Sequence, residues 1–143
     1  MGHITLIQEI FLVLLLFVIL EAIYEGLYDR GKSDKAWIVK NVNLSIILSK
    51  FFQLLFFINI FLFAKHCAEL GRFYYRFIFM WVAARVAVFN YINMLAAGRK
   101  NILGTTSVID RVLAKMTERA WWMYVLFTIG GAAYFYYSFI GYL

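Results

Sequence analysis

Charged side chains that interrupt long apolar stretches are the residues of this 143-residue sequence whose types and spacing could do chemistry. Glu21 and Glu25 are four residues apart, a spacing that places both carboxylates on one face of a helix. Lys50 and Arg85 supply positive charge from two other apolar stretches. A charged group inside a bilayer is costly and is by default a candidate for function. These four residues are therefore the candidates for catalysis, with a carboxylate as acid or base beside a group that holds an anion.

The depth of these residues in their helices predicts a polar cluster in the cytoplasmic half of a helix bundle. At 1.5 Å per residue, Lys50 lies about 12 Å from the cytoplasmic end of its helix, close to the depth of Glu21. This predicts a Glu21–Lys50 ion pair, with Arg85 nearer the bilayer centre. The predicted polar cluster consists of two acids, two bases and three amides: Glu21, Glu25, Lys50, Gln53, Arg85, Asn90 and Asn93.

Two interpretations of this predicted polar cluster stay open. A charge-neutral network would fix the register and rotation of the helices, as buried polar groups often do. Alternatively, a cavity open to the cytoplasmic interface would bind a polar headgroup, an ion or a proton. We favour the structural interpretation, because the two acids and the two bases neutralise one another.

A second polar group surrounds the link between the second and third apolar stretches. His66, Cys67 and Glu69, together with His3 near the N-terminus, are residue types that bind zinc. Their spacing is not diagnostic, because His66 and Cys67 are adjacent and a His-x-x-Glu pattern is common. Neither histidine lies deep in an apolar stretch, where a haem ligand would be expected. We therefore predict no metal site and no cofactor, and interpret these side chains as exposed at the interface.

Small and hydroxyl side chains are interpreted as helix-packing residues. Ser45 and Ser49 are expected to bond back to the backbone of their own helix, which leaves nucleophilic catalysis without support. Ala83 on the third helix and the Gly-Gly-Ala-Ala run over residues 130–133 on the last helix would let helix backbones approach closely.

The composition of the chain indicates a membrane environment. Hydrophobic residues make up 64% and aromatic residues 20% of the sequence, which is more apolar surface than a soluble domain of this size can bury. The net charge of +6 follows from Lys and Arg in loops, as in other membrane proteins, so it does not indicate a nucleic-acid partner. A single cysteine cannot form an intramolecular disulfide.

The positions of the apolar stretches predict an all-α, polytopic membrane protein with a single transmembrane domain over residues 1–143. Four transmembrane helices are expected in an antiparallel bundle, over about residues 4–28, 42–65, 72–97 and 120–142. Gly71 is expected to close the second helix, and the charged turn over residues 29–35, with Gly31 as its breaker, is expected to mark the exit of the first. A short amphipathic helix is expected between the third and fourth helices in the sequence, over about residues 106–118. It is expected to lie at the membrane interface.

The distribution of Lys and Arg predicts the orientation of the chain. The first and third connections carry most of the basic residues, so they are expected on the cytoplasmic side, with both termini on the non-cytoplasmic side. The first helix has no basic residue before it and no small-x-small cleavage site after Leu20, so it is interpreted as a permanent span. A bacterial inner membrane is the expected location, and an organelle membrane is the alternative.

A set of short motifs runs from the third helix into the following loop. The chain reads Arg-Val-Ala-Val-Phe-Asn over residues 85–90, then Gly-Thr-Thr-Ser over residues 104–107 and Asp110-Arg111. This segment resembles a group of small uncharacterised bacterial four-helix membrane proteins, which tend to have Asp where Asn90 stands. The resemblance implies that Arg85, Asn90 and the loop over residues 104–111 act as a unit. It implies no activity, and the amide at position 90 argues against an acid-base role there.

Three functional hypotheses follow from these observations. The leading one is a non-catalytic subunit or scaffold of a membrane assembly, with the lipid bilayer and either copies of the chain or a larger membrane complex as partners. The alternative is a membrane-embedded enzyme or carrier for a lipid-like substrate, which would use the predicted polar cluster. The third is an ion or proton pathway, which needs a continuous polar file across the membrane.

Overall fold

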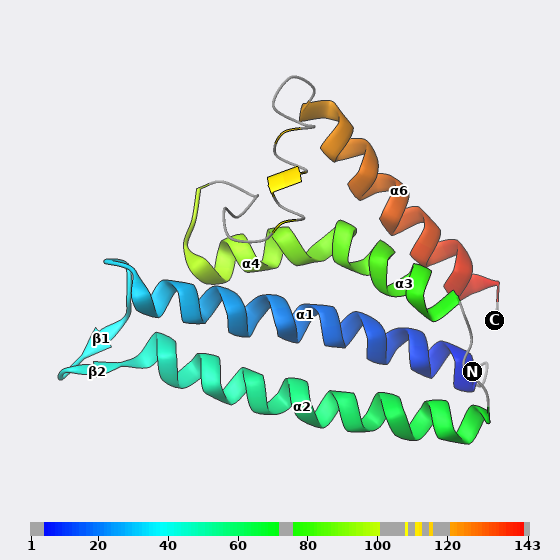
Figure 1. Cartoon of the computed structure of the whole chain (residues 1–143), viewed down its shortest axis with the longest axis horizontal. Helices are drawn as coiled ribbons and strands as arrows, with labels where there is room; N and C mark the ends of the chain where they lie inside the picture. The colour runs from blue at the N-terminus through cyan, green and yellow to red at the C-terminus, as the bar shows by residue number, and fades with distance from the viewer. Residues whose placement is uncertain are drawn as a thin grey trace.

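The computed structural model describes residues 5–71, 76–100, 108, 111, 112, 115 and 121–141, and most of them are helical. Figure 1 shows a long central helix, with a second long helix along one side and a line of shorter helical segments along the other. A last helix approaches that line at one end and diverges from it at the other (Figure 1). The elements in chain order are α1 (Leu6–Lys32), β1 (Ile38–Val39), β2 (Val42–Asn43), α2 (Leu44–Leu70), α3 (Arg76–Ala84), the π-helix η1 (Arg85–Phe89), α4 (Asn90–Ala97) and α6 (Trp121–Ile140).

Among the described residues, three helical stretches are long and apolar enough to cross a membrane, and a shorter apolar one lies within α6. The three are α1, α2 and the continuous run of α3, η1 and α4, while the shorter one is Val125–Ile140. These helices indicate a membrane protein. The mostly helical fold agrees with the all-α membrane bundle expected from the sequence.

Two helices extend past the bounds expected from the sequence. α1 continues through Gly31 to Lys32, and α2 continues to Leu70. α1 ends inside the predicted charged turn over residues 29–35, but Gly31 does not break the helix. This glycine is helical and lies against the side chain of Ile46 on α2, where a larger residue would collide. Gly71 does close α2, with a positive φ of 71°, a conformation that glycine adopts without strain.

The connection between α1 and α2 contains a short β-hairpin that the all-α prediction does not include. β1 and β2 pair in antiparallel fashion around Lys40 and Asn41, whose φ angles of 49° and 65° are both positive. Positive φ at both central residues is the geometry of a type I′ turn, which matches the twist of the flanking strands. Strands of two residues are too short to produce a detectable alternation in the sequence. Asn43 then caps α2 by accepting a hydrogen bond from the backbone N–H of Ile46 at 3.2 Å.

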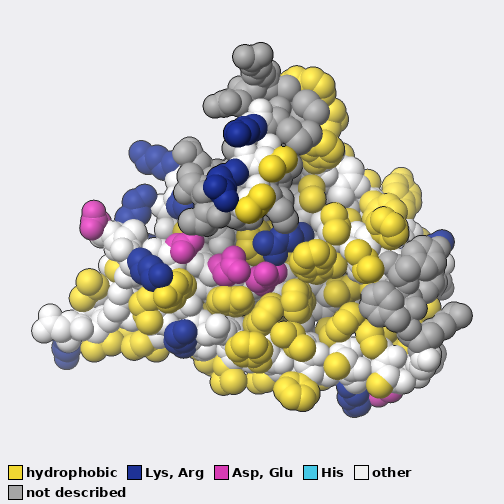
Figure 2. Space-filling model, viewed as in Figure 1, with side chains coloured by type: hydrophobic (Ala, Val, Ile, Leu, Met, Phe, Trp, Pro, Cys, Tyr) yellow, Lys and Arg dark blue, Asp and Glu magenta, His cyan; other side chains and the backbone are white. Residues whose placement is uncertain are grey.

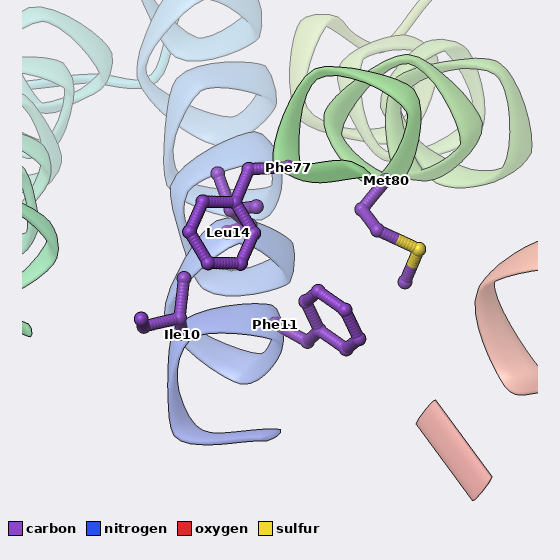
Figure 3. Close-up of a cluster of buried hydrophobic side chains, with 5 residues drawn as sticks. All are labelled: Ile10, Phe11, Leu14, Phe77 and Met80. Atoms are coloured by element: carbon purple, nitrogen blue, oxygen red, sulfur yellow. The ribbon is translucent and has the colours of Figure 1, made fainter. Parts of the chain in front are cut away.

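The apolar core lies between α1 and α3. The rings of Phe11 and Phe77 meet edge to face with their centroids 5.9 Å apart, a favourable geometry for aromatic rings. Figure 3 shows the side chains that form the cluster around them: Ile10, Phe11, Leu14, Phe77 and Met80. A second buried cluster continues along α1 toward η1: Val18, Ala22, Ala84 and Phe89.

Polar side chains join α2 to α1. Ser49 Oγ donates to the carbonyl of Tyr24 at 2.7 Å, and Asn59 Nδ2 donates to the carbonyl of Val13 at 2.9 Å. The hydroxyl of Ser45 accepts a hydrogen bond from the backbone of the hairpin connection at 3.1 Å. The prediction that Ser45 and Ser49 bond back to their own helix is therefore wrong, because both side chains are buried against neighbouring segments.

α6 contacts the rest of the chain mainly across α3 and η1. Gly131 makes a close approach, since a Cβ at this position would lie 2.8 Å from the carbonyl oxygen of Ala83. This confirms the prediction that small residues let these two helix backbones approach. Near the other end of α6, Gln8 of α1 donates from Nε2 to the carbonyl of Phe139 at 3.1 Å.

The predicted amphipathic helix over residues 106–118 falls mostly outside the described residues. Val108, Arg111, Val112 and Lys115 are described, and these four are helical and exposed. The other residues of this predicted helix lie outside the described part of the chain.

The close packing of α1 is tested at Gly26, and Gly130 of α6 is the control. At Gly26 an added Cβ would lie 2.7 Å from both the Ala96 Cβ and the Asn93 carbonyl oxygen, whereas at Gly130 nothing lies within 4 Å. Gly26→Ala is expected to lower the free energy of unfolding by about 1–3 kcal/mol through overpacking. Gly130→Ala is expected to leave it unchanged or to raise it by up to about 1 kcal/mol, because Ala favours a helix. Reversible unfolding in mixed micelles measures both, and equal effects would contradict the packing.

Candidate functional site

An ion pair between Glu21 and Arg85 joins α1 to η1. Arg85 Nη1 lies 2.8 Å from Glu21 Oε2, and only 22% of the Arg85 side chain and 16% of the Glu21 side chain are exposed. The Arg85 guanidinium also lies over the ring of Phe89, 4.0 Å from the ring centroid. Charges in an apolar interior are tolerated when they are paired and hydrogen-bonded, and are costly when they are not. In this pair each charge therefore neutralises the other within the group of helices.

The π-helix η1 begins at Arg85 and accommodates one extra residue in its wider turn. One row of buried positions in this run advances in steps of three or four residues, except across η1, where the step is five: Phe77, Met80, Ala84, Phe89, Asn93 and Ala97. η1 thus keeps the buried face of the run against α1 although the sequence slips by one residue. π-helical turns are frequent at functional sites, and the charged residue Arg85 stands at the start of this one.

An open groove of about 450 Å³, here called the polar groove, lies between α1 and α2 toward their hairpin ends. Lys50 Nζ lies 3.3 Å from Gln53 Oε1 and 5.8 Å from the centroid of the Tyr28 ring. Two acids and one base contribute to the lining, and Lys32 Nζ lies 4.0 Å from the centroid of the Tyr28 ring. Its lining residues are Tyr24, Glu25, Tyr28, Asp29, Ser49, Lys50 and Gln53.

A second open groove of about 420 Å³, here called the apolar groove, is formed by α1, α2 and α3. Its lining is aromatic and aliphatic except for Glu21. The indole Nε1 of Trp81 is buried and finds no hydrogen-bond acceptor among the described residues. The lining residues are Leu14, Phe17, Glu21, Phe63, Phe77, Ile78 and Trp81.

An amide side chain fastens α4 to α1. Asn93 Nδ2 donates to the carbonyl of Ala22 at 3.2 Å, and the Arg99 guanidinium donates to Asn93 Oδ1. Asn90, one turn earlier, is also buried. The hydrogen bond of Asn93 thus holds α4 against α1, and Arg99 holds the Asn93 side chain in place.

The structure divides the predicted polar cluster into three parts. Glu21 and Arg85 form the ion pair, Glu25, Lys50 and Gln53 line the polar groove, and Asn90 and Asn93 are buried on α4. The predicted Glu21–Lys50 ion pair is wrong. Depth along a helix says nothing of rotation about its axis, and Glu21 faces η1 while Lys50 lies beside residues of the polar groove.

None of the aromatic residues of the grooves was among the candidates from the sequence, and three of them carry a polar atom. Tyr24 and Tyr28 line the polar groove, and Trp81 lines the apolar groove. Tyr24 and Tyr28 each stand three residues after one of the candidate glutamates, so helical spacing could have identified them. Trp81 stands four residues before Arg85 and lies under its guanidinium, 5.7 Å from the ring centroid.

The described candidate metal ligands lie near one end of α2. His66 Nδ1 lies 3.5 Å from Glu69 Oε2 and 3.9 Å from Glu9 Oε2. Cys67 is half-buried and packs against the core cluster around Phe11. Within the described residues, no group of three His, Cys, Asp or Glu side chains is arranged to hold a metal ion. His3 lies outside the described residues.

The fold and these grooves describe a helical membrane protein with a central ion pair and two open grooves along one helix. No protein-family model matches the chain, and searches of curated proteins and of solved structures find no match. The resemblance of residues 85–111 to small bacterial membrane proteins therefore stays a prediction.

The ion pair is tested by a double-mutant cycle. Glu21→Gln is expected to destabilise the protein by about 3 kcal/mol, because it leaves the Arg85 guanidinium buried and unpaired. The double variant Glu21→Gln/Arg85→Gln is expected to cost less than the sum of its single variants, by more than about 1 kcal/mol. Lys50→Gln is the matched control and is expected to add to Glu21→Gln without coupling. Unfolding in mixed micelles gives the free energies, and additive effects of Glu21 and Arg85 would contradict the pairing.

Proposed function

We propose that the chain is a small integral membrane protein that serves as a non-catalytic subunit or scaffold of a membrane assembly. The observation that carries this proposal is the incomplete packing of α6, whose described side chains are all exposed or half-buried. α6 contacts the chain mainly across α3 and η1 and diverges from the other helices (Figure 1). A helix that buries so little of its surface in its own chain offers the remainder to lipid or to another helix.

Gly130 favours another helix over lipid on this surface of α6. Nothing lies within 4 Å of the position that a Cβ would take at Gly130, whereas the adjacent Gly131 lies against Ala83. Small residues are enriched at helix–helix interfaces in membranes because they permit close approach of the backbones. A glycine that faced lipid alone would weaken the helix without a compensating contact. Gly130 therefore supports contact with a second chain.

The ion pair supports a structural role for the charges of α1 and η1. The Glu21 carboxylate accepts a hydrogen bond from Arg85 at 2.8 Å, so each of these charges meets its opposite among the helices. Paired charges and interhelical hydrogen bonds fix the register of helices in a membrane. This arrangement suits a scaffold, whose role requires that its helices keep fixed positions relative to one another.

The same proposal includes a four-span topology, with α6 as the fourth span and both termini on the non-cytoplasmic side of a bacterial inner membrane or, alternatively, of an organelle membrane. α6 has 20 residues, which correspond to about 30 Å, the thickness of a hydrocarbon core. Basic side chains gather where the first connection meets the end of α4: Lys35 Nζ donates to the carbonyl of Gly98 at 2.7 Å, and Arg30 Nε donates to the carbonyl of Lys35 at 3.2 Å. Loops rich in Lys and Arg favour the cytoplasmic side.

The topology is tested by labelling single cysteines with a membrane-impermeant maleimide in spheroplasts and in inverted vesicles. Cys67 is the one cysteine of the sequence, so Cys67→Ser provides a background without thiols. In that background, Ser33→Cys at the exposed end of α1 is expected to react from the cytoplasmic side alone. A cysteine appended after Leu143 is expected to react from the opposite side alone. Reaction of both from one side would contradict four spans, and exchanged sides would contradict the orientation.

The grooves favour a second candidate function, a membrane-embedded enzyme or carrier for a lipid-like substrate. In this alternative the Glu25 carboxylate would act as acid or base, and Lys50 would hold an anionic group of the substrate. Both residues line the polar groove, which is open. Unchanged lipid composition in cells whose folded protein carries Glu25→Gln would argue against this alternative and leave the subunit proposal intact.

The subunit proposal is tested at the adjacent glycines of α6. Gly130→Ile fills the open position and is expected to reduce the amount of assembled complex seen by native mass spectrometry, while the isolated chain keeps its stability. Gly131→Ile forces bulk against Ala83 and is expected to destabilise the chain itself. Ala64→Ile, on the exposed face of α2, is the control for added bulk and is expected to change neither.

Two outcomes would contradict the subunit proposal. One is a wild-type chain that leaves its native membrane as a single protomer without other protein chains. The other is an assembly whose mass and abundance are the same in Gly130→Ile as in the wild type.

A further inference from the structure

We propose that one phospholipid with an ethanolamine headgroup binds along α1, with its headgroup in the polar groove and one acyl chain in the apolar groove. Such a bound lipid goes beyond the proposed subunit role and requires only that the chain lies in a bilayer. The alignment, length and charge of the two grooves each point to this occupant.

The two grooves follow one face of α1. Leu14, Phe17 and Glu21 line the apolar groove, and Tyr24 and Tyr28 line the polar groove. These positions advance in steps of three or four residues, which keep side chains on one face of a helix. α2 contributes to the walls of both grooves, and α3 contributes to the apolar one. Figure 2 shows acidic side chains gathered over this part of the molecule with apolar surface beside them.

Aromatic and charged side chains form the junction between the grooves. The ring centroid of Phe56 lies 4.6 Å from that of Phe17 and 5.2 Å from that of Tyr24. Glu21, paired with Arg85, stands between Phe17 and Tyr24 on the same face of α1. The lining thus changes from apolar to polar within about one helical turn. A phospholipid changes from acyl chain to headgroup over a similarly short distance.

The combined length of the grooves matches one leaflet of a bilayer. From Leu14 to Asp29, α1 rises about 22 Å at 1.5 Å per residue. Half of a bilayer, including its headgroup region, is about 20–22 Å thick. The polar groove lies toward the hairpin and the basic loop, where the headgroups of that leaflet are expected. A lipid in the grooves would therefore sit at its ordinary depth.

The charges of the polar groove fit a zwitterionic headgroup better than an anionic one. Glu25 and Asp29 contribute carboxylates, Lys50 contributes an ammonium, and Lys32 Nζ lies 4.0 Å from the centroid of the Tyr28 ring. A zwitterion can place its ammonium at the carboxylates and its phosphate at the lysines, whereas an anionic headgroup offers the carboxylates no positive group. A primary ammonium donates three hydrogen bonds, and a quaternary choline ammonium donates none. The ethanolamine headgroup matches the groove in both charge and donors.

The occupant is identified by native mass spectrometry of the protein after it is offered an equimolar mixture of phospholipids with identical acyl chains and ethanolamine, choline or glycerol headgroups. We expect one ethanolamine lipid per protomer, retained about fivefold more than either competitor. Equal retention of the three, or preference for the choline or glycerol lipid, would overturn the proposal. The same spectrum counts the protein chains, so failure of lipid selectivity is distinguished from failure of the subunit proposal.

Matched variants test each groove separately. Glu25→Gln combined with Asp29→Asn is expected to lower the preference for ethanolamine over glycerol lipid about fivefold, because neutral amides neither attract the ammonium nor repel the anion. Ile78→Trp fills the apolar groove from an exposed position and is expected to reduce retention of all three lipids equally. Glu69→Gln, an exposed acid at the other end of α2, is the control and is expected to change nothing. Wild-type selectivity in the folded Glu25/Asp29 variant would overturn the placement of the headgroup.

Discussion

The interaction on which the rest of the structure depends is the ion pair between Glu21 and Arg85. In an apolar interior each charge requires the other, so the pair favours one register between α1 and the third helical run. η1 satisfies this constraint, because its wider turn brings Arg85 to Glu21 while the residues on either side keep their buried face on α1. A run that was α-helical throughout would turn one half of that face away from α1. The π-helix thus lets Arg85 reach Glu21 while α3 and α4 both stay packed against α1.

α2, α3, η1 and α4 all pack against α1, and they contact it in different ways. α4 packs closely at Gly26, and Ile46 of α2 packs closely at Gly31. Ser49 and Asn59 of α2 reach carbonyl groups of α1, so backbone acceptors in the middle of a helix gain second partners. Lipid gives no hydrophobic driving force for helices to associate, so close approach and hydrogen bonds of this kind decide which faces meet.

The sequence predicts where a residue lies along a helix axis better than the direction in which its side chain points around that axis. Apolar length indicates the long helices, and Gly71 ends α2 as predicted. Residue counting places Glu21 and Lys50 at similar depth, but it cannot say which way each one points, and the expected partner of Glu21 was wrong for that reason. η1 and the two-residue strands escape detection because each spans too few periods of a regular pattern to stand out in the sequence. The tyrosines of the polar groove were missed because aromatic residues near the end of an apolar helix also suit a membrane interface.

Most of the contacts that define the unit of α1, α2 and the third helical run join residues that precede position 100, including the ion pair, the hydrogen bonds of Ser49 and Asn59, and the close approach at Gly26. The contacts of Gln8 with Phe139 and of Phe11 with Phe135 belong to α6. A ribosome releases these segments in order from the N-terminus. The three-helix unit can therefore assemble while α6 is still being synthesised, and the completed faces of α3 and η1 then act as the template on which the last helix docks.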